Sequence, residues 1–224
     1  MDAIVLAGGL GTRLRPLVSD LPKPMAPVNG RPFLELLLEY WIGQGVRRFV
    51  LSVGYLADRI ERHFGAHWCG AELLYVAEQE PLGTGGGFLS AVKQVQGHVL
   101  VMNGDSYFAI PLKELKAFHE ERRSDWTLAL FRSTDLERYQ GLSIAQDGRV
   151  QSLAGQTVNG GVYLMDTSRL ADLPWKAGER LSLENDLLPH ALAAGWRVYG
   201  REFDRPFVDI GVPQDYKSAG AIIQ

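Results

Sequence analysis

A short apolar run followed at once by glycines opens the chain, and this order restricts the fold more than any other feature. Residues 3–7 are apolar, and Gly8 and Gly9 interrupt them before a helix could form, so the run predicts a buried strand. Gly8, Gly9 and Gly11 have no side chains that would keep an anion away from the backbone N–H groups of the turn. The chain is therefore expected to begin with a strand that ends in an anion-binding loop.

Three cations follow this loop closely. Arg13 and Arg15 bring guanidinium groups with several donors, and Lys23 lies between Pro22 and Pro24, whose fixed φ angles stiffen the segment. A turn that merely reverses the chain has no need of this charge. Together with the glycines, the cations predict a site for the phosphates of a nucleoside triphosphate.

Two better-known glycine loops do not fit the sequence. A Walker loop continues with Gly-Lys-Ser/Thr, whereas Gly11 is followed by Thr12 and Arg13. A dinucleotide-binding loop has a third glycine where this chain has Leu14, and no acidic residue for a ribose follows the strand expected at residues 49–53. These departures weigh against a P-loop NTPase and against a dehydrogenase on a similar sheet.

The rest of the chain alternates strand and helix patterns without a repeat or a low-complexity linker, which predicts one layered α/β domain over residues 1–224. Strands are expected at residues 3–7, 49–53, 72–77, 98–102, 126–131, 142–145, 149–152, 162–165 and 197–202. Helices are expected at residues 32–44, 57–64, 87–95, 112–122, 186–194 and 215–223. The predicted fold class is a single-domain, Rossmann-like α/β/α sandwich with a mixed, mainly parallel sheet.

Charge and cysteine content narrow the class of protein. The net charge of −3 argues against a general nucleic-acid-binding protein, which would carry a basic excess. Cys69 is the one cysteine, so no intramolecular disulfide can form and a reducing compartment is expected. The N-terminus lacks the features of a signal peptide, because Asp2 stands where positive charge is expected and the apolar stretch at residues 3–7 is far too short. We expect a cytoplasmic protein that does not interact with membranes.

Several motifs resemble those of the sugar-phosphate nucleotidyltransferases, which make an NDP-sugar and pyrophosphate from an NTP and a sugar 1-phosphate. The motifs are LAGGLGTRLRPL (6–17), LPKPM (21–25), PLGTGG (81–86), NGD (103–105), NGGVYL (159–164), SLENDLLP (182–189) and FVDIGVP (207–213). They cover essentially the full chain. The family loop usually continues with threonine after the first motif, and this chain has Val18 there. The resemblance implies the nucleotidyltransferase fold, similar to that of GT-A enzymes, and the chain is expected to lack the C-terminal β-helix of many members.

Within this family, SVGYLAD (52–58), EPLGTGG (80–86) and NGGVYL are most like the enzymes that act on D-glycero-D-manno-heptose 1-phosphate. The resemblance therefore implies GTP and this heptose phosphate as substrates, with GDP-heptose as a precursor of capsule, lipopolysaccharide or other surface glycans. Mannose 1-phosphate guanylyltransferase remains an alternative. So do the uridylyl- and thymidylyltransferases that act on N-acetylmuramate or glucose 1-phosphate.

The reaction that the resemblance implies needs a divalent metal, because charge on the α-phosphoryl oxygens must be neutralised while an anionic phosphate approaches. Mg²⁺ is expected, held by one or two carboxylates together with phosphate oxygens and water. Asp105 follows a predicted strand and Asp209 is a second carboxylate far away in the sequence; by resemblance these two are the metal ligands. A capping or turn role is the alternative for each.

By the same resemblance Arg13, Lys23 and Asp105 are the catalytic residues. Arg13 would hold the departing pyrophosphate, and Lys23 would bridge the α-phosphate and the sugar phosphate. Arg15 is either a second anion contact or a solvated arginine. The residues expected to bind the nucleotide are Leu6, Ala7, Gly8, Gly9, Gly11, Thr12, Arg13, Glu80, Gly83, Thr84 and Asn103.

The choice of base must come from residues 6–8 and 78–85. Guanine presents adjacent N1–H and N2–H donors, which suit the carboxylates of Glu78 and Glu80. The amide of Gln79 would instead suit a pyrimidine base, so that choice stays open. Glutamates at this place are also compatible with a solvated surface.

The residues expected to bind the sugar are Gly85, Asn159, Gly160 and Glu184, although Asn159 and Glu184 could instead be buried capping residues. Relatives commonly carry a Glu-Lys-Pro lysine shortly before the Asn159 motif. Residues 152–158 read SLAGQTV and lack it, so either Lys23 and backbone donors suffice or another cation reaches the sugar phosphate. A binding protein without turnover is the alternative from another class, but it would be expected to lose Lys23 or the carboxylates. The oligomeric state is left open, a homodimer being one option.

Overall fold

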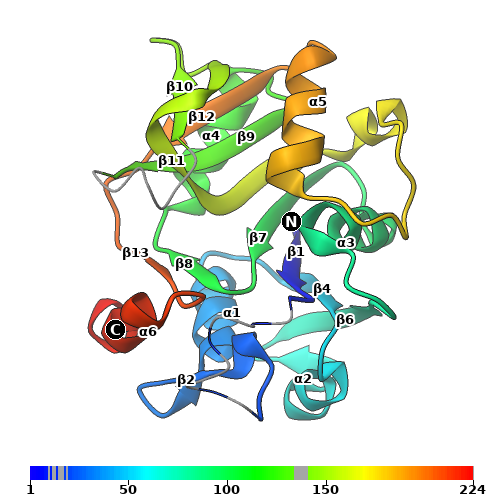
Figure 1. The fold of residues 1–224 in the computed structure, drawn as a ribbon, viewed down its shortest axis with the longest axis vertical. Helices are drawn as coiled ribbons and strands as arrows, with labels where there is room; N and C mark the ends of the chain where they lie inside the picture. The colour runs from blue at the N-terminus through cyan, green and yellow to red at the C-terminus, as the bar shows by residue number, and fades with distance from the viewer. Residues whose placement is uncertain (10, 12–13, 15–17, 19, 134–140, 224) are drawn as a thin grey trace.

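A mixed sheet lies at the centre of the computed structural model, which describes residues 1–9, 11, 14, 18, 20–133 and 141–223 (Figure 1). Within these residues nine strands form one sheet in the order β12-β9-β11-β7-β1-β4-β6-β5, with β10 paired to β11. The bounds are β1 (Asp2–Ala7), β4 (Arg48–Val53), β5 (His67–Trp68), β6 (Ala71–Ala77), β7 (His98–Asn103), β9 (Trp126–Arg132), β10 (Gly141–Ile144), β11 (Val150–Asp166) and β12 (Val198–Glu202).

Most of the central pairs are parallel. β1 pairs in parallel with β4 and β7, β4 with β6, and β12 with β9, whereas β11 runs antiparallel to β7, β9 and β10. Because β1 and β7 are parallel neighbours, the glycine loop after β1 and the turn after β7 leave the same edge of the sheet. This edge is where open α/β sheets bind their ligands.

Helices cover both faces of the sheet, and each face has its own apolar core. One core includes residues of α1 (Phe33–Gly43), α2 (Ala57–Phe64), α4 (Leu112–Glu121) and α6 (Pro213–Ile222). The other includes residues of α3 (Gly83–Ala91) and α5 (Leu188–Ala193). The predicted single α/β domain with a mixed, mainly parallel sheet is confirmed. Among the described residues, no helix has the length and apolar character needed to cross a membrane.

Two short ladders lie outside the central sheet. β2 (Pro27–Val28) pairs with β3 (Arg31–Pro32), and β8 (Ser106–Phe108) pairs with β13 (Phe207–Asp209). The second ladder joins segments that are about a hundred residues apart and places Asp209 opposite Ser106. It therefore carries the late FVDIG motif to the end of β7.

In three regions of the chain the predicted elements differ from the structure. The helix expected at residues 87–95 begins at Gly83, because the glycines of the PLGTGG motif form its first turn rather than a loop before it. The strands expected at residues 149–152 and 162–165 are parts of one long strand, β11, which continues through the NGG motif. The helix expected at residues 186–194 is the shorter α5, preceded by a π-helical turn at Leu183–Leu187.

Candidate active site

A cavity of about 350 Å³ opens at the carboxyl ends of β1 and β7, and we call it the glycine-loop cavity. Its lining residues are Leu6, Ala7, Gly8, Gly9, Gly11, Lys23, Pro24, Glu78, Pro81, Gly83, Thr84, Asn103, Gly104, Asp105 and Arg180. Most of the residues predicted to bind the nucleotide are among them. Glu80 is not: it is exposed, and its neighbour Glu78 lines the cavity instead. Thr12, Arg13 and Arg15 lie outside the described residues.

Lys23 connects the two carboxylates that the sequence separates by about a hundred residues. Its Nζ donates to Asp105 Oδ2 and lies 3.8 Å from Asp209 Oδ1. The Lys23 side chain is only 10% exposed, so it has left bulk water for this position. A Cβ at Gly211 would lie 2.1 Å from Lys23 Nζ, so this glycine leaves space for the ammonium in its present position.

Local hydrogen bonds orient both carboxylates. Asp209 Oδ1 accepts from the N–H of Gly211 at 2.7 Å, and Asp105 Oδ1 accepts from Ser106 Oγ at 3.2 Å. The β8–β13 ladder continues into this turn, where the N–H of Ile210 donates to the carbonyl of Asp105 at 2.9 Å. The three charged groups thus form one cluster, and backbone pairing between the two segments brings its carboxylates together.

Glu78 is positioned by donors on both of its oxygens. Ser52 Oγ donates to Oε1 at 2.9 Å, and the N–H of Leu82 donates to Oε2 at 3.0 Å. A Cβ at Gly8 would lie 2.2 Å from Oε1, so the first loop glycine leaves space for this carboxylate. By contrast, nothing lies within 4 Å of a Cβ at Gly9, which leaves the backbone there open to the cavity.

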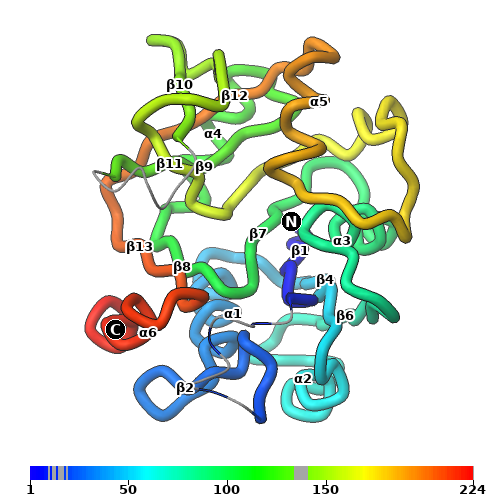
Figure 2. Tube along the Cα trace, in the orientation of Figure 1, coloured from blue at the N-terminus to red at the C-terminus, as the bar shows by residue number. Residues whose placement is uncertain are grey.

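The start of α3 is shaped by a segment that lies far away in the sequence. The carbonyl of Leu181 accepts from the N–H groups of Gly85 at 2.8 Å and Gly86 at 3.3 Å, and its own N–H donates to Leu82 at 2.8 Å. Figure 2 shows this segment, before α5, running beside α3. A Cβ at Gly86 would lie 2.1 Å from the carbonyl oxygen of Glu179. The segment can approach α3 only because glycines stand there.

This approach brings Arg180 to the glycine-loop cavity. Of the described residues that line the cavity, Lys23 and Arg180 are the cationic ones. Sequence reasoning missed Arg180, although it left open that a second cation would replace the missing lysine. The signal was weak, because an arginine in a polar stretch usually lies on a solvated surface.

A second cavity, of about 230 Å³, adjoins the first, and we call it the β11 cavity. Its lining residues are Asn103, Ser106, Leu142, Leu153, Val158, Asn159, Gly161, Glu184, Leu188, Phe207 and Asp209. Asn103 lines both cavities, and its Oδ1 is buried without a hydrogen-bond partner among the described residues. Such an oxygen favours a donor supplied by a ligand, since leaving it unpaired costs about 1–3 kcal/mol.

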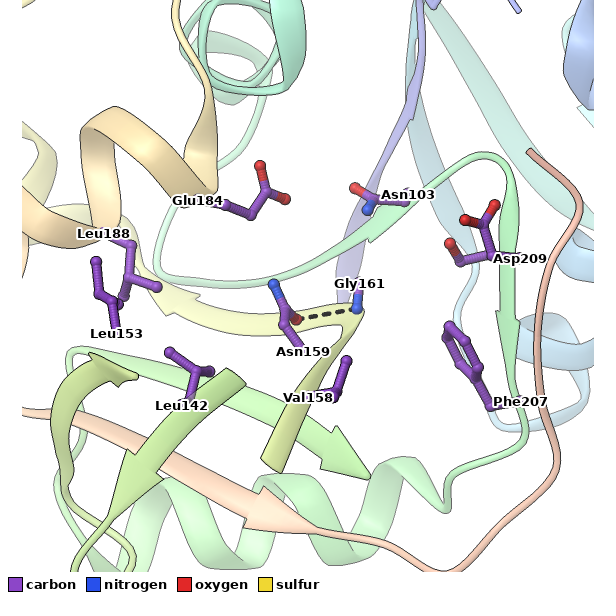
Figure 3. A pocket seen from close by; sticks show the side chains of 11 residues that line it. Asn103, Leu142, Leu153, Val158, Asn159, Gly161, Glu184, Leu188, Phe207 and Asp209 are labelled. Carbon is purple, nitrogen blue, oxygen red and sulfur yellow. Dashed lines mark hydrogen bonds between the residues drawn. The ribbon is translucent and has the colours of Figure 1, made fainter. Parts of the chain in front are cut away.

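The β11 cavity has polar and apolar sides. Figure 3 shows Asn159 and Glu184 facing its interior, with Asp209 at one end and leucines at the other. The predicted sugar-contacting residues Asn159 and Glu184 therefore line a common space. Gly85 and Gly160 do not: a Cβ at Gly85 would meet Leu181, and one at Gly160 would lie 2.3 Å from the ring of Phe108. Their lack of side chains serves packing.

Tyr163 is a further residue at this site that sequence reasoning missed. Its side chain is fully buried, and its hydroxyl lies between Asn159 and Glu184, with oxygen–nitrogen and oxygen–oxygen distances of 2.7 and 2.8 Å. Burial, reinforced by the charge of Glu184, raises the pKa of Tyr163 well above its ordinary value, so the hydroxyl keeps its proton. The sequence predicts only a strand at residues 162–165, but a buried tyrosine usually needs a partner for its hydroxyl.

Comparisons with known proteins agree over the whole chain. The family model described as nucleotidyl transferase matches residues 2–224. D-glycero-alpha-D-manno-heptose 1-phosphate guanylyltransferase of Aneurinibacillus thermoaerophilus is 38% identical, and the alignment covers 100% of this chain and 99% of the relative. The enzyme of the same name from Campylobacter jejuni is 37% identical, with 96% and 97% covered.

A solved structure shows the same likeness. The crystal structure of HddC from Yersinia pseudotuberculosis superposes with a TM-score of 0.86 at 33% identity and covers 100% of this chain and 99% of that one. HddC has also been solved in complex with GMP-PN.

Proposed function

This chain belongs to the nucleotidyl transferase family, and from that premise we propose that it transfers GMP from GTP to D-glycero-α-D-manno-heptose 1-phosphate. The products would be GDP-heptose and pyrophosphate. Two relatives named for this activity, 38% and 37% identical over nearly their whole lengths, support the choice of substrates.

One observation carries the proposal: the cluster of Lys23, Asp105 and Asp209 lies where the two cavities meet. Lys23 and Asp105 line the glycine-loop cavity and Asp209 lines the β11 cavity, while Asn103 lines both. A nucleotide in the first cavity and a sugar phosphate in the second would bring their phosphates together at this cluster. That is the arrangement needed for transfer between two phosphates.

In the proposed reaction, an oxygen of the sugar 1-phosphate attacks the α-phosphorus of GTP in line, and pyrophosphate leaves. The nucleophile is already ionised near neutral pH, so the protein needs neither a general base nor a covalent intermediate. Its contribution is position and charge. We assign Lys23 to the α-phosphate and the incoming phosphate, Arg13 to the pyrophosphate, and Arg180 to additional positive charge at the glycine-loop cavity.

The donor set fits a divalent cation. Asp105 and Asp209 together already hold one positive charge, the Lys23 ammonium, at their junction. Two carboxylates suit Mg²⁺, which normally keeps water and phosphate oxygens among its ligands. When bound, Mg²⁺ would neutralise charge on the phosphoryl oxygens.

We assign recognition of guanine to Glu78. Its two oxygens accept from Ser52 and from the Leu82 backbone and retain further lone pairs, which can accept from guanine N1–H and N2–H. Uracil and thymine place one donor between two acceptors and cannot satisfy a carboxylate in the same way.

A GTP-dependent enzyme with a lone, exposed cysteine is consistent with a cytoplasmic location.

A substrate grid tests the proposal. The purified protein with Mg²⁺ would be given each of four NTPs with heptose, mannose or glucose 1-phosphate, and pyrophosphate release would be measured. We expect the highest kcat/KM for GTP with the heptose, and a lower value for mannose 1-phosphate, which lacks one hydroxymethyl branch at C6. A higher value for UTP or dTTP than for GTP, or for glucose 1-phosphate than for both manno-configured sugars, would contradict the assignment. Absence of turnover would favour a binding protein.

A further inference from the structure

The hydroxyl of Tyr163 connects two side chains of the β11 cavity without lining the cavity itself. Asn159 Nδ2 donates to this hydroxyl at 2.7 Å, and the hydroxyl donates to Glu184 Oε1 at 2.8 Å. Tyr163 is 0% exposed, so no ligand touches its ring or hydroxyl from solvent. Any effect of Tyr163 on a ligand must act through these two partners.

A distortion of β11 creates this contact. Asn159 pairs with Leu130 of β9, and Tyr163 pairs with Leu128, so four steps along β11 oppose two steps along β9. The extra residues form a bulge in which Gly161 has a φ of +69°, a conformation that favours glycine. The N–H of Gly161 donates to Asn159 Oδ1 at 3.0 Å. The bulge thus turns the Asn159 amide back toward Tyr163.

The donors and acceptors in this network allow one arrangement. A carboxylate only accepts, so the single hydroxyl proton of Tyr163 goes to Glu184 and the hydroxyl oxygen must accept from Asn159. Asn159 therefore directs its NH₂ group to Tyr163 and its oxygen to the Gly161 N–H. Both hydrogen bonds require the same orientation of the amide. What remains for a ligand is the second N–H of Asn159 and the unused lone pairs of Glu184.

The second oxygen of Glu184 also has hydrogen-bond partners that fix its position. Glu184 Oε2 accepts from Thr84 Oγ1 at 2.9 Å and from Ser182 Oγ at 3.0 Å. Thr84 belongs to α3 and lines the glycine-loop cavity, so the carboxylate is anchored from both sides of the junction between the cavities. Among the hydrogen bonds of the described residues, the one from Tyr163 is the only bond that the Glu184 carboxylate accepts from the central sheet.

We propose that Tyr163 is a positioning residue for the sugar: one buried hydroxyl sets an amide donor and a carboxylate acceptor side by side to bind two neighbouring sugar hydroxyls. One sugar hydroxyl donates to Glu184 and the other accepts from Asn159. This inference rests on the proposed function, because it takes the β11 cavity as the sugar site. It adds a residue that changes the affinity for the sugar through Asn159 and Glu184 and does not affect nucleotide binding.

Tyr163→Phe tests the inference, because it removes the hydroxyl and keeps the ring. With the sugar 1-phosphate that the wild type uses best, we expect KM for the sugar phosphate to rise about tenfold and KM for GTP to stay within twofold. The matched control is Tyr75→Phe, which removes a hydroxyl bond of 2.7 Å to the carbonyl of Gly65, a residue that lines neither cavity. The control should change neither KM. Thermal melting and circular dichroism would check folding of both variants.

A double-mutant cycle with Glu184→Gln asks whether Tyr163 acts through Glu184. Non-additive effects on KM for the sugar phosphate would support positioning, and additive effects would refute it. An unchanged sugar KM in Tyr163→Phe, or an equal rise in both KM values, would refute the positioning role, and a variant that does not fold would assign the hydroxyl to the fold instead. If the wild type turned over no sugar 1-phosphate with any NTP, the proposed function would fail and this inference with it.

Discussion

Replacing Glu78 by glutamine should change the base preference while leaving the fold intact. The substitution is nearly isosteric, which matters because Gly8 and Gly87 approach the carboxylate so closely that a Cβ on either would lie within 2.8 Å of Oε1. The N–H of Leu82 requires an oxygen at the Oε2 position. The new NH₂ group must therefore take the Oε1 position, where the Ser52 hydroxyl can rotate to accept from it.

The expected magnitude follows from this fixed orientation. Guanine then meets one donor where it needs an acceptor, and the lost charge-assisted bond is worth about 1.5–3 kcal/mol. Since each 1.36 kcal/mol is a factor of ten, kcat/KM for GTP should fall by about 10- to 100-fold. UTP and dTTP, whose edges alternate donor and acceptor, should lose nothing or improve. The ratio of GTP to UTP specificity should therefore fall by at least one power of ten.

Pyrophosphate release, measured with each NTP at a saturating sugar 1-phosphate concentration, gives these ratios directly. Glu80→Gln is the matched control, because Glu80 is exposed and lies outside the lining of the glycine-loop cavity. We expect it to keep the wild-type ratio. An unchanged ratio in Glu78→Gln, or an equal change in both variants, would refute the assignment of the base to Glu78.

Three further predictions concern charge. Asp105→Asn and Asp209→Asn should each lower kcat by several powers of ten with little change in melting temperature, and wild-type activity in Mg²⁺ for both would contradict their role as metal ligands. Lys23→Met, which keeps bulk without charge, should depress kcat more than it weakens GTP binding measured by calorimetry; retained turnover would remove Lys23 from the mechanism. Burial, together with the nearby His98, lowers the pKa of His119 to about 4, below its ordinary 6.5, so stability should be lost as pH falls from 6.5 toward 4. Between pH 7 and 5 this loss is about 2 kcal/mol in urea unfolding, and His119→Gln should lack it; an equal pH dependence in both proteins would argue against a buried, neutral His119.

The two glutamates after β6 show where sequence reasoning had to stop. Along a strand, Glu78 and Glu80 would point to the same face, but β6 ends at Ala77 and Pro81 follows soon after. Outside a strand the alternation of faces no longer holds. The sequence is therefore compatible with either glutamate at the base, and the structure shows only that Glu78, held by Ser52 and Leu82, lines the glycine-loop cavity.

Arg180 and Tyr163 illustrate the two ways in which a site residue can escape notice. Arg180 reaches the glycine-loop cavity because the Leu181 backbone pairs with glycines of α3 about a hundred residues earlier, a contact without a local pattern. Tyr163 did carry a signal, a polar group in an apolar strand, but its partners depend on the bulge at Gly161.

The sequence by itself determined the α/β fold, because apolar periodicity, glycine and proline act within a few residues. It also predicted an anion-binding loop after the first strand, with Lys23 close behind it, whereas Asp105 and Asp209 were indicated by the motifs that resemble those of the family. Only the tertiary structure decided which side chains meet. The β8–β13 ladder sets Asp209 beside Asp105, and the pairing of Leu181 with α3 sets Glu184 beside Thr84. Such meetings depend on backbone pairing between distant segments, which short-range patterns do not specify.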